Sequence, residues 1–296
     1  MSDTLFLGII GDGSSCKARL CNDAGDILAE TGTDAAATLQ GSEKAVAEIN
    51  LVATKALTLA GLAADRVIEL HVGAGLADLS LAHEQKQLSQ IPHRFASFTA
   101  HADTYIACLG AHDGEDGGIV IADTDSCAAL IDKGEYISFG GWGFLLSDQG
   151  SGAALGRAGL RRALLGHEMV QPQTPMGYWI MAQFGHSPET MTIWAEKASA
   201  SDYASFAARI FDFAREDDPV AVEISREAAN DLAVFVRALK QRSEDPVCLA
   251  GEFAEPARPW MPAEIREMIS SPRGDSLDGA LIMARRNLQR RQAGAA

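Results

Sequence analysis

Residues 5–33 read LFLGIIGDGSSCKARLCNDAGDILAETGT, and this stretch decides the fold class. An apolar run at 5–10 precedes the turn GDGSS, and CKARLCND then alternates apolar and polar positions up to a second turn. The pattern predicts a β-hairpin, which DILAETGT extends as a third strand. Residues 117–141, GGIVIADTDSCAALIDKGEYISFGG, repeat this order of strands and turns. Two copies of one three-strand unit predict two related α/β domains with a cleft between them.

The residues outside these two units alternate between helical and strand-like spacing. In the first half we expect a helix from a Ser42 cap to a Gly61 stop, a strand at 66–76, a helix at 78–88, a short strand at 95–98 and a helix at 104–109. In the second half we expect helices at 202–215 and 219–242, a strand at 246–251 and a last helix at 277–290.

Composition limits the function classes. The chain has 296 residues, 47% of them hydrophobic, which suits two domains of ordinary size. Its net charge of −15 would repel nucleic acid and anionic membranes, so we expect no nucleic-acid and no membrane partner and a small-molecule ligand instead. The five cysteines form no CxxC pair, which argues against a disulfide framework and a zinc site. No stretch approaches the roughly 20 apolar residues that span a bilayer, and we expect a cytoplasmic protein.

Four stretches between residues 8 and 260 carry a family resemblance. They are GIIGDGSSCKARL at 8–20, TAHADTYIACLGAHDGEDGG at 99–118, GGWGFLLSDQGSG at 140–152 and CLAGEFAEPARPW at 248–260. With them the chain resembles the glucosamine and N-acetylglucosamine kinases of the BadF/BadG/BcrA/BcrD ATPase group, in the actin-like, hexokinase-like superfamily. The resemblance implies two ribonuclease H-like (actin-like ATPase) domains, at 1–112 and 113–276, with a last helix at 277–291 that packs back on the first.

The resemblance implies an ATP-dependent phosphorylation of an amino sugar, glucosamine or N-acetylglucosamine, at a hydroxyl group, with ATP and Mg²⁺ as cofactors. Such a transfer needs a base, a positioned acceptor and a neutralised phosphate. Asp103 matches the family's catalytic aspartate, which takes the proton from the sugar hydroxyl. An aspartate in front of a helix is also typical of a capping residue, here for a helix that begins at Thr104. Both roles can coexist.

The sugar side of the site is implied by the third stretch. Gly140, Gly141 and Trp142 resemble the segment that lines the hexosamine site, and Asp148 resembles the acid that binds sugar hydroxyls. Gly75 resembles a residue of the family's turn beside the substrate. The alternative interpretation is a glycine-rich turn with Trp142 in the core and Asp148 as the cap of the following helix.

The nucleotide side is implied by both hairpins and by the last stretch. The matching residues are Gly11, Asp12, Gly13, Ser14 and Ser15 in the first hairpin, Thr124 and Ser126 in the second, and Gly251 at the adenosine motif. Asp12 is also the candidate metal ligand, because a carboxylate oxygen suits Mg²⁺.

The nucleotide motifs depart from the family pattern at several positions. Ile10 stands where the family has a metal-ordering aspartate, and Asp12 replaces a glycine. Asp123 and Asp125 replace the glycines of Gly-Thr-Gly-Ser, and Glu252 replaces the second glycine of the adenosine motif. The asparagine that helps to bind the sugar in the family corresponds to Ala35, next to Asp34.

Three explanations of the added acids remain open. They form a rearranged Mg²⁺ site, or they mark a nucleotide half that no longer transfers phosphate, or they are turn residues that point into solvent. Since an acid beside a phosphate weakens its binding, kinase activity and a sugar-binding homologue without phosphotransfer, acting as a regulator or sensor, both stay candidates.

Two further points concern partners and class. The cysteines do not cluster in sequence, which disfavours an ATPase that carries an iron–sulfur cluster and activates a dehydratase. The apolar spacing at 219–240 fits either the core or the surface of a homodimer.

Overall fold

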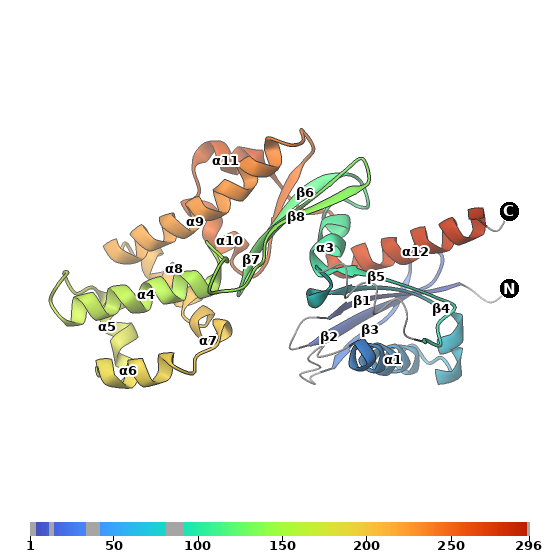
Figure 1. Cartoon of the computed structure of the whole chain (residues 1–296), viewed down its shortest axis with the longest axis horizontal. Coiled ribbons are helices and arrows are strands. Elements are labelled where there is room, and N and C mark those ends of the chain that lie inside the picture. Colours follow the sequence, from blue (N-terminus) through green and yellow to red (C-terminus); the bar gives the residue numbers. More distant parts are fainter. Residues whose placement is uncertain (1–3, 12–14, 34–41, 81–91, 295–296) are drawn as a thin grey trace. The chain divides into compact units, whose positions relative to one another are not determined.

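The computed structural model describes residues 4–11, 15–33, 42–80 and 92–294. The chain divides into two compact units. Unit 1 comprises residues 1–117, 131–136 and 272–296, and unit 2 comprises residues 118–130 and 137–271. Each unit contains a five-stranded sheet with helices packed on it (Figure 1). The predicted α/β class with two hairpin-headed halves is confirmed.

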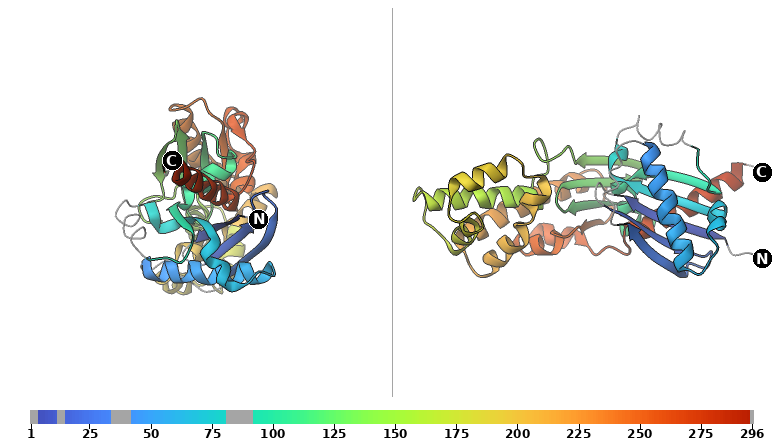
Figure 2. Two further views of the ribbon diagram at one scale, coloured as in Figure 1. Left: turned by 90° about the vertical axis from the view of Figure 1, so that its right-hand side faces the viewer. Right: turned by 90° about the horizontal axis from the view of Figure 1, so that it is seen from below.

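Unit 1 begins with the predicted three-strand hairpin unit. Its elements are β1 (Leu5–Gly11), β2 (Cys16–Cys21), β3 (Ile27–Thr33), α1 (Ser42–Leu59), the 3₁₀ helix η1 (Ala64–Glu69), β4 (Leu70–Leu76), the 3₁₀ helix η2 (Ala77–Ser80), β5 (Ser97–Ala102), α3 (Asp103–Ala111) and α12 (Ser276–Gly294). The strand order is β3-β2-β1-β4-β5. β1 runs antiparallel to β2 and parallel to β4, and β4 runs parallel to β5. α1 packs on one face of this sheet, and α3 and α12 pack on the other (Figures 1 and 2).

Three expected elements of unit 1 differ from the structure. The strand expected at 66–76 begins at Leu70, because residues 64–69 form a 3₁₀ helix that buries Val67 and exposes Ile68. The strand expected at 95–98 is displaced to Ser97–Ala102, where it pairs with β4 along its whole length. Of the helix expected at 78–88, the structure has a short 3₁₀ turn that ends at Ser80, and residues 81–91 lie outside the described residues.

A cluster of charges fixes the start of α12 against β2. Asp275 and Asp278 accept each other's backbone N–H groups at 3.0 Å, which closes the first turn of the helix. The Arg19 guanidinium, on β2, bonds to both carboxylates, at 2.8 Å and 2.5 Å, and to Glu30 of β3 at 2.6 Å. Since the Arg19 side chain is only 11% exposed, this contact ties a helix near the C-terminus to the first hairpin.

Unit 2 is built on the second hairpin unit, whose three predicted strands are confirmed. Its sheet contains β6 (Gly117–Ala122), β7 (Ser126–Asp132), β8 (Glu135–Gly140), β9 (Val247–Ala250) and β10 (Ile269–Ser270), in the order β10-β9-β6-β7-β8. The turn end of the β7–β8 hairpin, residues 131–136, belongs to unit 1. Its helices are α4 (Gly152–His167), α5 (Pro175–Ala182), α6 (Pro188–Ala195), α7 (Ala200–Ala204), α8 (Ala207–Arg215), α9 (Pro219–Lys240), α10 (Ala254–Ala257), η3 (Arg258–Trp260) and α11 (Ala263–Met268). The apolar stripe of α9 lies in the core of this unit.

Two expectations from composition can be compared with the structure. All five cysteines lie among the described residues and are buried, and no disulfide joins any two of them. Among the helices that the structure describes, none has the length and hydropathy required to cross a bilayer.

Candidate functional site

The predicted residues of unit 1 lie where its parallel strands end. In the sheet register, Ile10 of β1 lies opposite Gly75 of β4, and Gly75 lies opposite His101 of β5. Gly11 ends β1 one residue later, and Asp103 follows directly on β5 as the first residue of α3. Because carboxyl ends of parallel strands meet at one edge of a sheet, the structure brings Gly11, Gly75 and Asp103 to the same edge.

Gly75 has a packing role at this edge. A Cβ atom at Gly75 would lie 2.1 Å from Cδ1 of Ile106 and 3.2 Å from Cα of Asp103. The first turn of α3 therefore lies against β4 at a distance that only glycine allows. This contact fixes where α3 begins and so where the Asp103 carboxylate lies.

Asp103 is half-buried and takes part in the first turn of α3. The helix begins one residue earlier than expected, with Ala102 in the capping position and no side-chain capping bond from it. The carboxylate of Asp103 accepts the backbone N–H of Thr104 at 2.7 Å. The carboxylate is thus oriented by the start of the helix, although Asp103 is not its N-cap.

An aromatic cluster that the sequence analysis missed surrounds this turn. The rings of His101 and Tyr105 stack at 4.0 Å, and Tyr136 meets both edge-on at 4.9 and 5.4 Å. The Tyr136 hydroxyl lies 2.5 Å from the Thr104 hydroxyl. Burial lowers the pKa of His101 to about 4, so its imidazole is neutral at pH 7. His101 and Tyr105 flank Asp103 in sequence, but no local pattern predicts that Tyr136 of β8 joins them.

Asp148 is the most unusual side chain of unit 2. It is 1% exposed and has a left-handed backbone with φ of 68°. Its carboxylate accepts a backbone hydrogen bond from Ser126, while its Oδ1 atom is buried without a hydrogen-bond partner among the described residues. Burial, together with the negative charge of Asp125, raises the pKa of Asp148 to about 6. An orphaned carboxylate oxygen in a buried position is the kind of group that a ligand hydroxyl satisfies.

The interpretation of Asp148 as a helix cap is wrong. α4 begins at Gly152, and its N-cap is Ser151, whose hydroxyl accepts the N–H of Ala154 at 3.0 Å. Asp148 lies three residues before that cap. Its burial is therefore not explained by the helix.

The glycine-rich loop before Asp148 presents an aromatic side chain to solvent. Gly140 and Gly141 have φ values of 73° and 70°, and the N–H of Gly141 bonds to the carbonyl of Ser126 at 3.3 Å. Trp142 is 70% exposed, so its assignment to the core is wrong. An exposed indole and a buried carboxyl group six residues apart in one loop are the two kinds of group that bind a sugar ring, an apolar face and a hydrogen-bond acceptor.

The turn between β6 and β7 is bonded to the start of α4. The N–H of Asp123 bonds to the carbonyl of Asp125 at 2.9 Å and closes the turn. The carbonyls of Asp123 and Thr124 accept the N–H groups of Gly152 and Ala153, at 2.8 and 3.2 Å. The Ser126 hydroxyl bonds to the carbonyl of Gln149 at 2.7 Å. The residues predicted for the nucleotide and for the sugar are thus joined within unit 2.

Gly251 lies at the end of β9, beside the end of β6. Its φ is 103°, and a Cβ atom would lie 2.3 Å from the carbonyl oxygen of Ala122. The next N–H, that of Glu252, bonds to Oδ1 of Asp123 at 3.2 Å. The interpretation that the added acids simply point into solvent is therefore wrong for Asp123, whereas Asp125 is exposed.

The remaining predicted residues are placed as follows. Ser15 directly precedes β2. Asp12, Gly13, Ser14, Asp34 and Ala35 lie outside the described residues.

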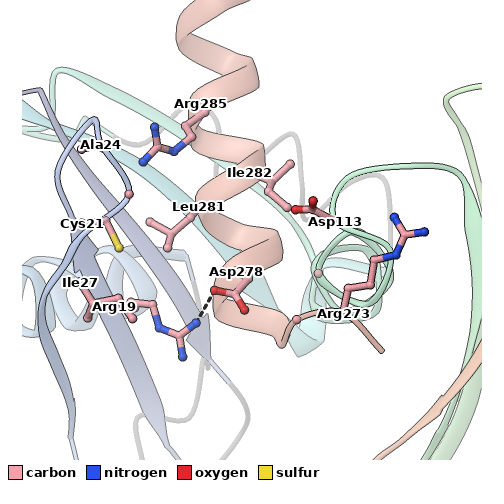
Figure 3. Close-up of a pocket in the computed structure, with 13 residues that line it drawn as sticks. Arg19, Cys21, Ala24, Ile27, Asp113, Arg273, Asp278, Leu281, Ile282 and Arg285 are labelled. Atoms are coloured by element: carbon pink, nitrogen blue, oxygen red, sulfur yellow. Dashed lines mark hydrogen bonds and ion pairs between the residues drawn. The ribbon is translucent and has the colours of Figure 1, made fainter. Parts of the chain in front are cut away.

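A separate cavity of about 410 Å³ lies within unit 1 (Figure 3). It is lined by the β2–β3 turn and by α12, at the edge of the sheet where β1 begins, since Cys21 pairs with Phe6. The Arg19 side chain points to Asp278 in this view, and Arg285 bonds to carbonyls of the β2–β3 turn. Because its arginines are engaged by the protein and it lies at the opposite edge from Asp103, we do not assign the candidate site to this cavity.

Comparison with known proteins shows the family of the chain. Residues 7–280 match the model of the BadF/BadG/BcrA/BcrD ATPase family. Over 279 residues the chain is 36% identical to the glucosamine kinase GspK of Vibrio cholerae, covering 94% of this chain and 95% of the relative. A Dictyostelium discoideum N-acetyl-D-glucosamine kinase is 30% identical over 142 residues, 46% of this chain and 44% of the relative.

Solved structures share the fold. A Chromobacterium violaceum protein assigned as an N-acetylglucosamine kinase superposes with a TM-score of 0.87 at 28% identity, covering 96% of this chain and all of the other. A ROK family glucokinase from Streptomyces griseus has a TM-score of 0.57 at 17% identity, over 95% of this chain and 99% of the other, and shows the fold alone. Since the family model and the Vibrio cholerae relative both extend over almost the whole sequence, the chain belongs to the BadF/BadG/BcrA/BcrD ATPase family.

Proposed function

We propose that this protein phosphorylates an amino sugar, glucosamine or N-acetylglucosamine, at a hydroxyl group, with ATP as the phosphoryl donor. The relatives named above are glucosamine and N-acetylglucosamine kinases, which supports the substrate class. The single structural observation that carries the proposal is the buried Asp148 carboxyl group, whose Oδ1 atom has no hydrogen-bond partner within the described part of the chain.

In this proposal Asp148 binds the sugar. A sugar hydroxyl that donates to Oδ1 would supply the missing hydrogen bond and would stabilise the carboxylate form. Trp142 would contact the apolar face of the ring or its N-substituent. Since ligand hydroxyls favour the ionised form, sugar binding should lower the pKa of Asp148 and should release protons near pH 6.

Asp103 is the proposed base. A carboxylate at the start of α3, bonded to the Thr104 N–H, can accept the proton of a sugar hydroxyl as that oxygen attacks phosphorus. Gly75 and the cluster of His101, Tyr105 and Tyr136 would position it, because they fix the β5–α3 junction. ATP would supply the γ-phosphoryl group.

The described residues fit a nucleotide only in part. The turn at Gly251 fits, because its backbone lies so close to Ala122 that only glycine is accommodated there. Against this, Ile10 offers no metal ligand, and the Asp123 carboxylate already holds the Glu252 N–H. None of the described residues predicted for the nucleotide is therefore assigned as a metal ligand.

The alternative to the kinase is a sugar-binding homologue without phosphotransfer. The two candidates differ in the nucleotide, because the kinase must bind Mg-ATP and the binding protein need not.

Titration calorimetry of Mg-ATP, with and without glucosamine or N-acetylglucosamine, separates the two candidates. ATP binding that strengthens with sugar, followed by product formation that Asp103→Ala lowers by about 10²–10⁴-fold, supports the kinase. Asp103→Asn is the matched variant, since it keeps an oxygen for the Thr104 N–H but removes the base. A heat of binding for the sugar, with none for Mg-ATP and no phosphorylated product, would support the binding protein.

A further inference from the structure

The contact between Asp123 and Glu252 joins two turns that are 129 residues apart. β6 and β9 are parallel neighbours in register, with Ile121 opposite Ala250, so the residues that follow them meet at one edge of the sheet. There the N–H of Phe253 bonds to the carbonyl of Ala122 at 2.9 Å, and the N–H of Glu252 bonds to the Asp123 carboxylate at 3.2 Å. The backbone alone would make the first of these bonds, whereas the second requires the Asp123 side chain.

The side chain is not needed to form its own turn. The main chain closes the turn through the Asp123 N–H and the Asp125 carbonyl, and the carbonyl of Asp123 accepts the Gly152 N–H at 2.8 Å. Asp123 has no left-handed φ that would demand a special residue. The carboxylate holds the Glu252 N–H of the neighbouring turn instead.

A glycine at 123 would leave that N–H open. A backbone N–H at the end of a sheet is a typical donor to an anionic ligand group. With Asp123 in place, the N–H already has an anionic partner, and a phosphate oxygen that approached it would meet both an occupied donor and a negative charge. Two unit charges about 4 Å apart at an effective dielectric near 20 weaken an affinity by roughly a thousandfold, and solvent screening reduces this factor.

We propose that Asp123 determines the affinity for the phosphoryl donor, because its carboxylate occupies the Glu252 N–H that an anionic group of the donor would otherwise use, so that the donor binds only by displacing it. This inference rests on the proposed function. Asp123 stands where the family pattern has glycine. Its carboxylate competes with the donor for the Glu252 N–H and does not bind the donor itself.

Three variants test the proposal by titration calorimetry with Mg-ATP at constant ionic strength. Asp123→Gly removes the competitor and should tighten ATP binding by roughly 10–100-fold. Asp123→Asn removes the charge but keeps an oxygen that can accept the Glu252 N–H, and it should give a smaller gain. Asp217→Gly is the matched control, since Asp217 is an exposed turn aspartate of unit 2 with φ of 62°, and its affinity for ATP should equal that of the unchanged protein.

Amide hydrogen exchange supplies a readout that does not depend on ATP. The Glu252 N–H should exchange at least about tenfold faster in Asp123→Gly than in the unchanged protein, while the Phe253 N–H should keep its protection. Equal protection of Glu252 in both proteins would overturn the contact on which the proposal rests.

The outcomes separate this proposal from the proposed function. If the unchanged protein phosphorylates the sugar and Asp123→Gly binds ATP no more tightly, the role of Asp123 is wrong and the kinase function stands. If only Asp123→Gly and Asp123→Asn bind ATP, the role of Asp123 is supported and the kinase function of the natural chain is wrong. If no variant binds ATP while all bind sugar, both are wrong.

Discussion

Replacement of Asp148 by asparagine should stabilise unit 2, and the gain should depend on pH. The pKa of this carboxyl group rises from 3.8 to about 6 through burial and through the charge of Asp125. A raised pKa means that the folded state binds the proton more tightly than the unfolded chain does. The resulting stability is fully present below about pH 3.8 and is lost as the pH rises to about 6.

The magnitude follows from the two pKa values. At about 1.4 kcal/mol per pH unit, the ionised group costs about 3 kcal/mol at pH 8 and about 0.6 kcal/mol at pH 4. Asparagine stays neutral, keeps the shape and tolerates the φ of 68°. Asp148→Asn should therefore raise the melting temperature of unit 2 by roughly 6–12 °C at pH 8 and by roughly 1–2 °C at pH 4.

Differential scanning calorimetry between pH 4 and pH 8 measures the gap, which is the difference in melting temperature between Asp148→Asn and the unchanged protein. Asp217→Asn is the control, because Asp217 shares the left-handed backbone but is exposed, and its gap should not change with pH. A gap for Asp148→Asn that is the same at both ends of the range, or a loss of stability at pH 8, would refute the reasoning. In the unchanged protein, the affinity for N-acetylglucosamine, which has no titrating amine, should rise as the pH passes through about 6.

Other substitutions test the packing and the loop. Gly251→Ala, which would place a Cβ atom 2.3 Å from the Ala122 oxygen at a φ of 103°, should cost roughly 2–4 kcal/mol in urea unfolding of unit 2. Arg19→Met should lower the stability of unit 1 by roughly 1–2 kcal/mol, because Asp275 and Asp278 lose their cation, and high salt should reduce the difference. Trp142→Phe should leave the melting temperature within about 1 °C, since the indole is 70% exposed, but should abolish any sugar-dependent change in tryptophan fluorescence that arises at this loop.

The sequence predicted those elements whose pattern is local. The hairpin units were visible because their strands alternate and their turns are short, and the helix expected at 219–242 was visible from its apolar spacing. The single helix expected at 202–215 is wrong, because the structure has two helices there, α7 and α8, which are separated at residues 205–206. Residues 66–69 were misassigned as strand, because the apolar pair Val67 and Ile68 fits a strand as well as a 3₁₀ helix. The β5 strand was misplaced because its core, SFTAHA, has few strand-forming residues and is held by pairing with β4.

The chemistry of the site was less accessible to sequence reasoning. The family resemblance indicated Asp103 and Asp148. It did not predict that Asp148 is buried with an oxygen that no described residue bonds, which depends on the packing of the loop against the β6–β7 turn. The bond from Glu252 to Asp123 depends on the parallel pairing of β6 and β9, for which 129 residues of separation leave no local signal.

The two acids of the β6–β7 turn have different physical consequences, although the sequence presents them as equivalent glycine replacements. Asp123 accepts a backbone N–H from the neighbouring turn, so its charge is partly satisfied inside unit 2. Asp125 is exposed, and its charge raises the pKa of Asp148. The main chain closes this turn by itself, through the Asp123 N–H and the Asp125 carbonyl. Both side chains therefore act on groups outside their own turn. The two acids therefore change the electrostatics of the residues proposed for the phosphoryl donor and of those proposed for the sugar. Replacement of either acid is expected to change the affinity for both ligands.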